Sequence, residues 1–261
     1  MADDPQEEEL VGGGVNRIVR VGATVRRPSG PWTPAIHSLL DHLHQRGFTQ
    51  APRAHGLDPD GREILDFIPG QAGHYPLPHY VRTDSTLLAV GTLLRNLHDA
   101  TVDFTPPPDT AWYMPARGPA EVICHGDIAP YNCVFRDGRL FAFIDFDTAH
   151  PGPRVWDLAY AAYRFVPLTG PDNDDFHLPI AEQARRLRLL ADAYRLCEAG
   201  RDVIADTART RLDHLVCHMH EQADAGNTAF AQHIAAGHDQ LYQADAAHIA
   251  HHKVYLTDAL R

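Results

Sequence analysis

Residues 125–132 read His-Gly-Asp-Ile-Ala-Pro-Tyr-Asn, and residues 141–147 read Phe-Ala-Phe-Ile-Asp-Phe-Asp. Between the two polar clusters, apolar runs at 132–135 and 140–144 flank Arg136-Asp137-Gly138, a pattern that predicts a β-hairpin. Because paired strands return the chain to its starting point, the hairpin is expected to bring Asn132 close to Asp145. The two segments should therefore form one site.

The residue types in these segments suit phosphoryl transfer. A carboxylate at Asp127 can orient an acceptor hydroxyl and accept its proton. The amide oxygen of Asn132 and the carboxylate of Asp145 are hard oxygen ligands of the kind that Mg²⁺ prefers. The spacing and the chemistry together predict a kinase site.

Composition narrows the function classes. The 261 residues include 34 acidic and 23 basic ones, a formal net charge of −11, which argues against a nucleic-acid partner. The acidic amino terminus is unlike a signal peptide, and no apolar run reaches membrane-span length, so a cytoplasmic protein without a membrane partner is expected. The four cysteines, which form no C-x-x-C pair, are expected to be buried reduced thiols: Cys124, Cys133, Cys197 and Cys217.

Strands and helices fall in separate blocks. Alternating apolar positions predict strands within 9–27, 51–56 and 62–68, with one helix from Pro34 to about Gly47. Residues 71–82 have no period and are expected to form a loop, and a helix should follow from Thr83. Later helices are expected at 154–165, 180–198, 202–224 and 227–250, which places Lys253 beyond the last one. This order predicts an α+β fold.

The pattern H-G-D-I-x-x-x-N, followed by a hairpin and I-D-F-D, resembles the catalytic and metal loops of the aminoglycoside-phosphotransferase and choline-kinase family, whose fold is similar to that of protein kinases. Three more segments resemble family elements in the same order. They are a nucleotide-covering glycine loop at 13–16, an adenine hinge at 63–70 and a helix after the metal loop at 156–159.

The resemblance implies a two-lobed kinase that transfers the γ-phosphoryl group of ATP or GTP, with Mg²⁺, to an alcohol. It implies a flexible acidic amino terminus at 1–8, a small nucleotide-binding lobe at 9–70, and a catalytic and substrate-binding lobe at 71–261. By matching position, the implied residues are Asp127 as catalytic base, Asn132 and Asp145 as metal ligands, His125 and Asp157 as supports of the loop, and Gly13, Gly14, Asn16, Arg27, Phe67 and Ile68 at the nucleotide.

The amino-terminal lobe departs from the family pattern. Family members place a Lys on the third strand, paired with a Glu on the following helix, but the first Lys of this chain is Lys253. Alternation along Thr24–Arg27 makes Arg27 the expected replacement, with Arg26 as the alternative. His37 stands where the helical Glu is expected. The contact with the nucleotide phosphates is therefore expected either to use a different set of residues or to be weaker.

The acceptor is expected to be an aminoglycoside-like antibiotic or a related hydroxylated metabolite. Acids at Asp147, Asp174 and Asp175 favour a cationic acceptor, because like charges that lie so close repel one another. The alternative is an ordinary solvated acidic loop. The oligomeric state is left open.

Two other readings compete with the kinase. A kinase-like binding or immunity protein without catalysis is the main alternative, since the usual Lys and Glu are missing. The Asp145-Phe146-Asp147 run also resembles haloacid-dehalogenase-type phosphatases, but Ala149 stands where their motif needs Thr or Val, and the chain lacks their βαβ order. His214 and His218 are read as a solvated helix face rather than a zinc site.

Overall fold

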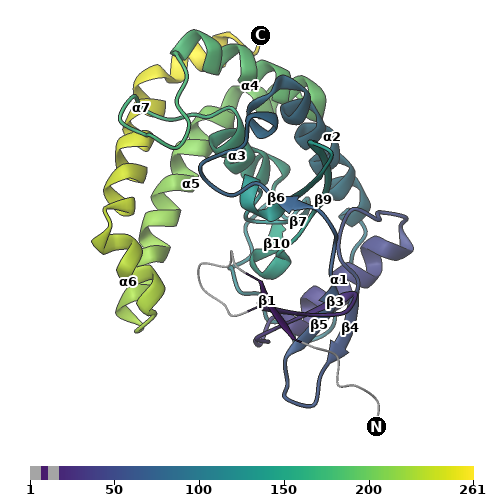
Figure 1. The fold of residues 1–261 in the computed structure, drawn as a ribbon. Coiled ribbons are helices and arrows are strands. Elements are labelled where there is room, and N and C mark those ends of the chain that lie inside the picture. Colours follow the sequence, from purple (N-terminus) through teal and green to yellow (C-terminus); the bar gives the residue numbers. More distant parts are fainter. Residues whose placement is uncertain (1–6, 11–17) are drawn as a thin grey trace.

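The computed structural model describes residues 7–10 and 18–261. A small sheet with one helix lies at the lower right of Figure 1, and a larger helical part fills the upper left, with short strands between them. The glycine loop predicted at 13–16, with Gly13, Gly14 and Asn16, lies outside the described residues. The expected α+β arrangement of two lobes is confirmed.

The small lobe is an antiparallel sheet in the order β1-β2-β3-β5-β4. Its strands are β1 (Glu8–Leu10), β2 (Ile18–Val21), β3 (Thr24–Arg27), β4 (Ala54–Leu57) and β5 (Glu63–Asp66). Helix α1 (Thr33–Gln45) buries an apolar stripe that includes Ile36, Leu39 and Leu43. Central strand β3 pairs with β5 so that Arg27 lies opposite Glu63, a register that decides the chemistry of the lobe.

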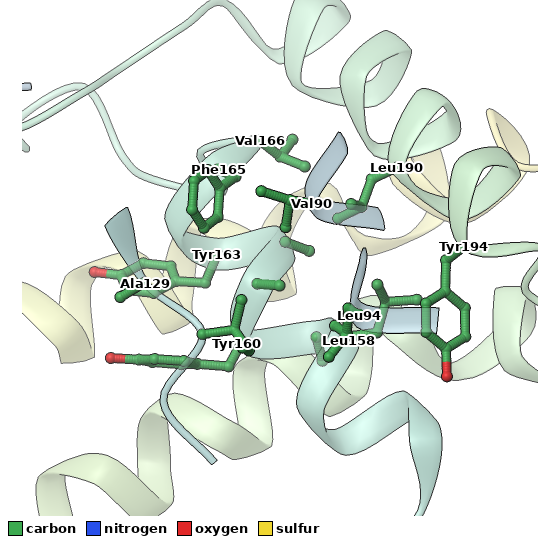
Figure 2. Close-up of a cluster of buried hydrophobic side chains, with 14 of the residues drawn as sticks. Val90, Leu94, Ala129, Leu158, Tyr160, Tyr163, Phe165, Val166, Leu190 and Tyr194 are labelled. Atoms are coloured by element: carbon green, nitrogen blue, oxygen red, sulfur yellow. The ribbon is translucent and has the colours of Figure 1, made fainter. Parts of the chain in front are cut away.

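The large lobe is a helical bundle. Its helices are α2 (Asp84–Thr101), α3 (Arg154–Phe165), α4 (Ile180–Tyr194), α5 (Glu198–Asp224), α6 (Thr228–Ala235) and α7 (His238–Asp258). Helix α3 is central and nearly all of it is buried. Figure 2 shows Leu158 of α3 beside Leu94 of α2, with Leu190 and Tyr194 of α4 nearby. This packing fixes the helix that follows the predicted metal loop.

The residues of the predicted site lie on or next to short strands between the two lobes. Strand β8 (Cys133–Arg136) pairs with β9 (Arg139–Phe143) as the expected hairpin. Strand β7 (Val122–Cys124), which leads into the 125–132 segment, pairs with β10 (His150–Gly152). Single 3₁₀ turns cover Pro130–Asn132 and Phe146–Thr148.

Three expectations about the secondary structure need correction. The 71–82 loop contains strand β6 (Gln71–Ala72), which pairs with β8, and a 3₁₀ turn at His79–Arg82. The helix expected at 227–250 is two helices, because Gly237 takes a positive φ of 82° that ends one helix and starts the next. Helix α7 continues to Asp258, so Lys253 lies within it and forms an ion pair with Asp206.

The cysteine expectation holds for two of the four residues. Cys124 and Cys133 are buried free thiols, whereas Cys197 and Cys217 are exposed. Cys197 immediately precedes α5, and Cys217 lies on the solvent side of that helix, where local apolar neighbours do not ensure burial. Among the described helices, none combines the length and apolarity needed to cross a membrane.

Candidate active site

The 125–132 loop is held in one conformation by its own polar groups. Gly126 has a φ of 85°, and a side chain there would collide with the carbonyl of Thr148, so only glycine fits. His125 is buried, and its Nε2 lies 3.0 Å from the carbonyl oxygen of Ile144. Asn132 donates from Nδ2 to the backbone oxygen of Asp127 (3.0 Å) and to its Oδ2 (2.9 Å). The loop therefore presents Asp127 in a fixed position.

Asp127 is a partly buried carboxylate. Burial raises the pKa of Asp127 above its ordinary value, although the nearby charges of Arg164, His125 and Arg211 oppose the rise. The hydroxyl of Tyr131 donates to Oδ1 at 3.0 Å. An ionised carboxylate with a raised pKa is a better proton acceptor than a solvated aspartate.

Asp157, at the start of α3, supports the loop from below. It is fully buried and accepts hydrogen bonds from the backbone N–H groups of His125 (2.7 Å) and Gly126 (3.0 Å). It also accepts one from His98 Nε2 (3.1 Å), a residue of α2 that the sequence analysis did not identify. Burial alone would raise the pKa of Asp157, but these hydrogen bonds lower it to about 2.

His98, Cys124 and Asp157 have donor atoms within 4.8 Å of one another, the kind of grouping that can hold a metal ion. In this structure, however, both ring nitrogens of His98 already have hydrogen-bond partners, since Nδ1 lies 2.6 Å from the hydroxyl of Tyr194. Burial raises the pKa of the Cys124 thiol well above its ordinary value, which disfavours the thiolate that a metal requires. The cluster is a hydrogen-bonded brace.

The hairpin brings Asn132 and Asp145 together. The N–H of Ile144 donates to the carbonyl of Asn132 at 2.9 Å, and Asp145 follows directly with a φ of 65°. That left-handed conformation turns the carboxylate out of the strand, and its side chain is 49% exposed. The hydrogen bonds among the described residues leave Asn132 Oδ1 and Asp145 Oδ2 without donors. Two oxygen ligands are thus available to a hard divalent cation.

Arg27 on β3 contacts three carboxylates. Its Nε donates to Glu63 at 2.5 Å, one Nη donates to Asp145 at 2.6 Å, and the other bonds Asp147. Glu63 is buried and is also bonded by His37 Nε2 at 3.0 Å. The acid that pairs with the strand cation therefore comes from β5, and His37 acts as a second support. The strand cation thus has an acidic partner, which comes from the sheet and not from α1.

Glu63, Asp145 and Asp147 place three acidic groups around one guanidinium. Burial raises the pKa of Asp147 to about 6, the nearby Asp145 adds to the rise, and Arg27 opposes it. Bringing further positive charge to this place would relieve the repulsion among the acids. The negative charges at this site would therefore stabilise a bound cation.

The expected adenine hinge follows β5. The N–H of Phe67 donates to the carbonyl of Ala23 at 2.9 Å, and the guanidinium of Arg20 lies 4.1 Å from its ring centroid. No hydrogen bond from the described residues uses the backbone of Ile68. Of the two predicted hinge residues, only Ile68 therefore has both its N–H and its carbonyl free of hydrogen bonds from the described residues.

The acids expected at the acceptor do not form one group of free carboxylates. Asp147 is engaged by Arg27, and Asp174 and Asp175 are exposed on the loop before α4. Sequence reasoning overlooked a set of aromatic residues that gather around Arg164 and reach Asp127 through Tyr131, because they are distributed over four separate elements. The set comprises Tyr75, Tyr131, Tyr160, Tyr163 and Tyr242.

Comparison with known proteins identifies the family of the chain. Residues 111–206 match the model of the phosphotransferase enzyme family. The chain is 35% identical over 213 residues to the trifolitoxin immunity protein of Rhizobium leguminosarum bv. trifolii, covering 78% of this chain and 80% of that protein. The chain belongs to the phosphotransferase enzyme family. The sequence-based recognition is thereby confirmed.

Solved structures support the same fold for this phosphotransferase-family chain. An amicoumacin kinase in complex with AMP-PNP, Ca²⁺ and Ami superposes with a TM-score of 0.63 at 14% identity, covering 88% of this chain and 87% of the other. An ethanolamine kinase of Plasmodium vivax superposes with a TM-score of 0.64 at 12% identity, covering 93% and 85%. At such identities the likeness concerns the fold.

Arg27 should be the cation that contacts nucleotide phosphates. We expect Arg27→Met to weaken nucleotide binding by about tenfold or more, because the fork of a buried guanidinium binds phosphate oxygens strongly. Arg26→Met and Lys253→Met should have little effect, since Arg26 bonds Thr24 and Lys253 lies on α7. Calorimetric titration of the three variants checks this. A loss confined to Lys253→Met would contradict the assignment.

Proposed function

We propose that the protein transfers the γ-phosphoryl group of ATP or GTP to a hydroxyl group of a small, antibiotic-like molecule. The observation that carries the proposal is the position of Asn132. Its Nδ2 fixes Asp127, while its backbone carbonyl is bonded by the residue before Asp145. One residue thus links a base for the acceptor to a ligand set for the nucleotide's cation.

In the proposed reaction, the acceptor hydroxyl oxygen attacks the γ-phosphorus in line with the bond that breaks. Its proton passes to a carboxylate oxygen of Asp127. The bond from the γ-phosphorus to the bridging oxygen breaks, and its electron pair leaves with the nucleoside diphosphate. Tyr131, bonded to Oδ1 of Asp127, and Asn132, bonded to Oδ2, keep the carboxylate oriented.

Asn132 and Asp145 would hold a divalent cation, and Mg²⁺ suits their oxygen donors. When bound, such an ion would supply positive charge that stabilises the negative charge developing on the phosphates. The proposed role of Arg27 is to contact the same phosphates from β3. Its present bond to Asp145 would then be exchanged for phosphate oxygens. We assign nucleotide binding to residues 9–70 and acceptor binding to 71–261.

The biological role that we propose is protection against a toxic small molecule. The relative at 35% identity is named a trifolitoxin immunity protein, and the kinase of similar fold is named for amicoumacin and is complexed with Ami. A second candidate function, immunity by binding without turnover, is favoured by the same name. The two candidates differ in whether nucleotide is consumed when the target is present.

Removal of Asp145 tests the proposed reaction. We expect Asp145→Ala to abolish the Mg²⁺ dependence of nucleotide binding and to lower affinity by at least about tenfold, since the triphosphate charge loses its bridging cation. Titration with and without Mg²⁺, paired with a screen of nucleotide consumption over hydroxylated antibiotics, gives the readout. If the variant retains the metal dependence, the ligand lies elsewhere. If wild-type protein consumes no nucleotide with any target that it binds, immunity by binding is favoured.

A further inference from the structure

A guanidinium without a carboxylate partner lies beside the proposed base. Arg164, on α3, is partly exposed and donates from Nε and one Nη to the hydroxyl of Tyr160, both at 3.1 Å. The same Nη lies 3.3 Å from the hydroxyl of Tyr242. Within residues 7–10 and 18–261, no carboxylate comes within ion-pair distance of it. A cation in this setting has unmet capacity for an anion.

Four tyrosine rings surround this guanidinium. The carbon Cζ of Arg164 lies 5.1–5.7 Å from the ring centroids of Tyr131, Tyr160, Tyr163 and Tyr242. Figure 2 shows Tyr160 and Tyr163 extending in the same direction beside Ala129, with their hydroxyl groups at the same end. Although burial disfavours the charged form, the tyrosines hold the pKa of Arg164 well above its ordinary value. The cage thus contains a permanent cation.

The cage is connected to Asp127. Tyr131 donates to Oδ1 of Asp127, and its hydroxyl lies 3.4 Å from that of Tyr160, which accepts from Arg164. Asp245, a second acid near the cage, is already bonded by Tyr163, by Asn173 and by the N–H of Gly170. The charge of Arg164 acts on Asp127 and Asp245 from a distance, but neither forms a direct ion pair with it, so an incoming anion would not have to displace one.

We propose that Arg164 binds the acceptor, and that the acceptor carries an anionic group, such as a carboxylate, near its reacting hydroxyl. The inference rests on the proposed kinase function. Aromatic cages bind organic cations, but here the protein's own guanidinium fills the cage. What the site offers instead is a guanidinium fork, which pairs with carboxylates in bidentate geometry.

This proposal competes with the cationic acceptor suggested by the acidic residues of the sequence. That suggestion relied on Asp147, Asp174 and Asp175 acting together. Asp147 is engaged by Arg27, and Asp174 and Asp175 lie exposed in their loop. Arg164, in contrast, is connected to Asp127 through the hydroxyl groups of Tyr160 and Tyr131.

A charge series of three small alcohols of nearly equal size tests the inference. Glycerate is anionic, glyceramide is neutral and 3-amino-1,2-propanediol is cationic. Each is titrated by calorimetry into the protein saturated with Mg²⁺ and a non-hydrolysable ATP analogue. Wild-type protein should bind glycerate about tenfold or more tightly than either other alcohol. Arg164→Met should remove the preference, and Arg164→Lys should keep part of it. Arg209→Met, on the exposed face of α5, is the matched control and should bind as wild type does.

The outcomes are distinct. Equal binding of the three alcohols, undetectable binding of glycerate, or a preference for the amine in wild-type protein overturns the inference. So does a glycerate preference that survives Arg164→Met. If Arg164→Met fails to fold, the affinities of the wild-type protein and of Arg164→Lys for the three alcohols still test the inference. Failure of the kinase proposal appears separately, as a lack of Mg²⁺-dependent nucleotide binding before any alcohol is added.

Discussion

Asp127→Asn should lower the rate of phosphoryl transfer by about two to four orders of magnitude, which is the usual contribution of a positioned base. Nucleotide affinity should change little, because Asp145 and Arg27 are the groups placed for phosphates and their cation. Asparagine preserves the volume of the side chain and can still interact with Tyr131, so the loop should keep its conformation. The loss should therefore appear in turnover and not in binding.

Steady-state rates and calorimetric nucleotide affinity, measured on the same preparations, check the prediction for Asp127. Asp213→Asn is a suitable control, because Asp213 is an exposed acid of α5 that pairs only with Arg209 among its described contacts. Turnover near the wild-type rate in Asp127→Asn would show that another group accepts the proton. A large fall in nucleotide affinity would indicate instead that Asp127 acts on the metal side.

The hairpin and its flanking loops could be predicted from the sequence because their geometry is local. Arg136-Asp137-Gly138 forces the turn, and antiparallel pairing then returns the chain, so Asn132 and Asp145 must meet. The α+β order followed in the same way from separate blocks of strand and helix periodicity. Residues 71–72 were missed because a two-residue strand is too short to show alternation.

The partner of Arg27 could not be predicted in this way. Glu63 lies opposite Arg27 only because β3 pairs with β5 in one register, and no periodicity within either strand specifies that register. The acid was looked for on α1, where His37 stands, yet the structure places the acid on the sheet and the histidine behind it. An acid at the first position of β5, directly before the apolar Ile64 and Leu65, is the one local signal that Glu63 offered.

Arg164 illustrates the same limit in the helical lobe. Within Arg154–Phe165 it is one polar residue near the end of a helix, which is an ordinary place for a solvated arginine. Its cage forms only when Tyr131 of the catalytic loop and Tyr242 of α7 approach α3. These residues are separated by long stretches of sequence, so the cage is a property of tertiary packing.

Asp157→Ala should be the most destabilising single substitution at the site, with a loss of about 3–5 kcal/mol in the free energy of unfolding. Three donors would lose their acceptor in a fully buried place: the N–H groups of His125 and Gly126, and Nε2 of His98. Because two of these donors belong to the catalytic loop, activity should fall together with stability. Urea unfolding, with Asp213→Asn as the exposed control, measures the difference.

The pH dependence of the free energy of unfolding distinguishes the effect of the negative charge of Asp157 from the effect of the size of its side chain. Its pKa of about 2 in the folded protein lies below the value of about 3.9 expected when unfolded, so ionisation favours folding. The resulting contribution, about 2–3 kcal/mol, should be complete above about pH 4 and lost as the pH falls towards 2. Asp157→Asn should abolish this part of the rise of the free energy of unfolding with pH in the acid range. Asp245→Asn should change the same slope in the opposite sense, because burial raises the pKa of Asp245 above its ordinary value. If Asp157→Asn leaves the slope in the acid range unchanged, the carboxylate is not the ionised brace of the loop.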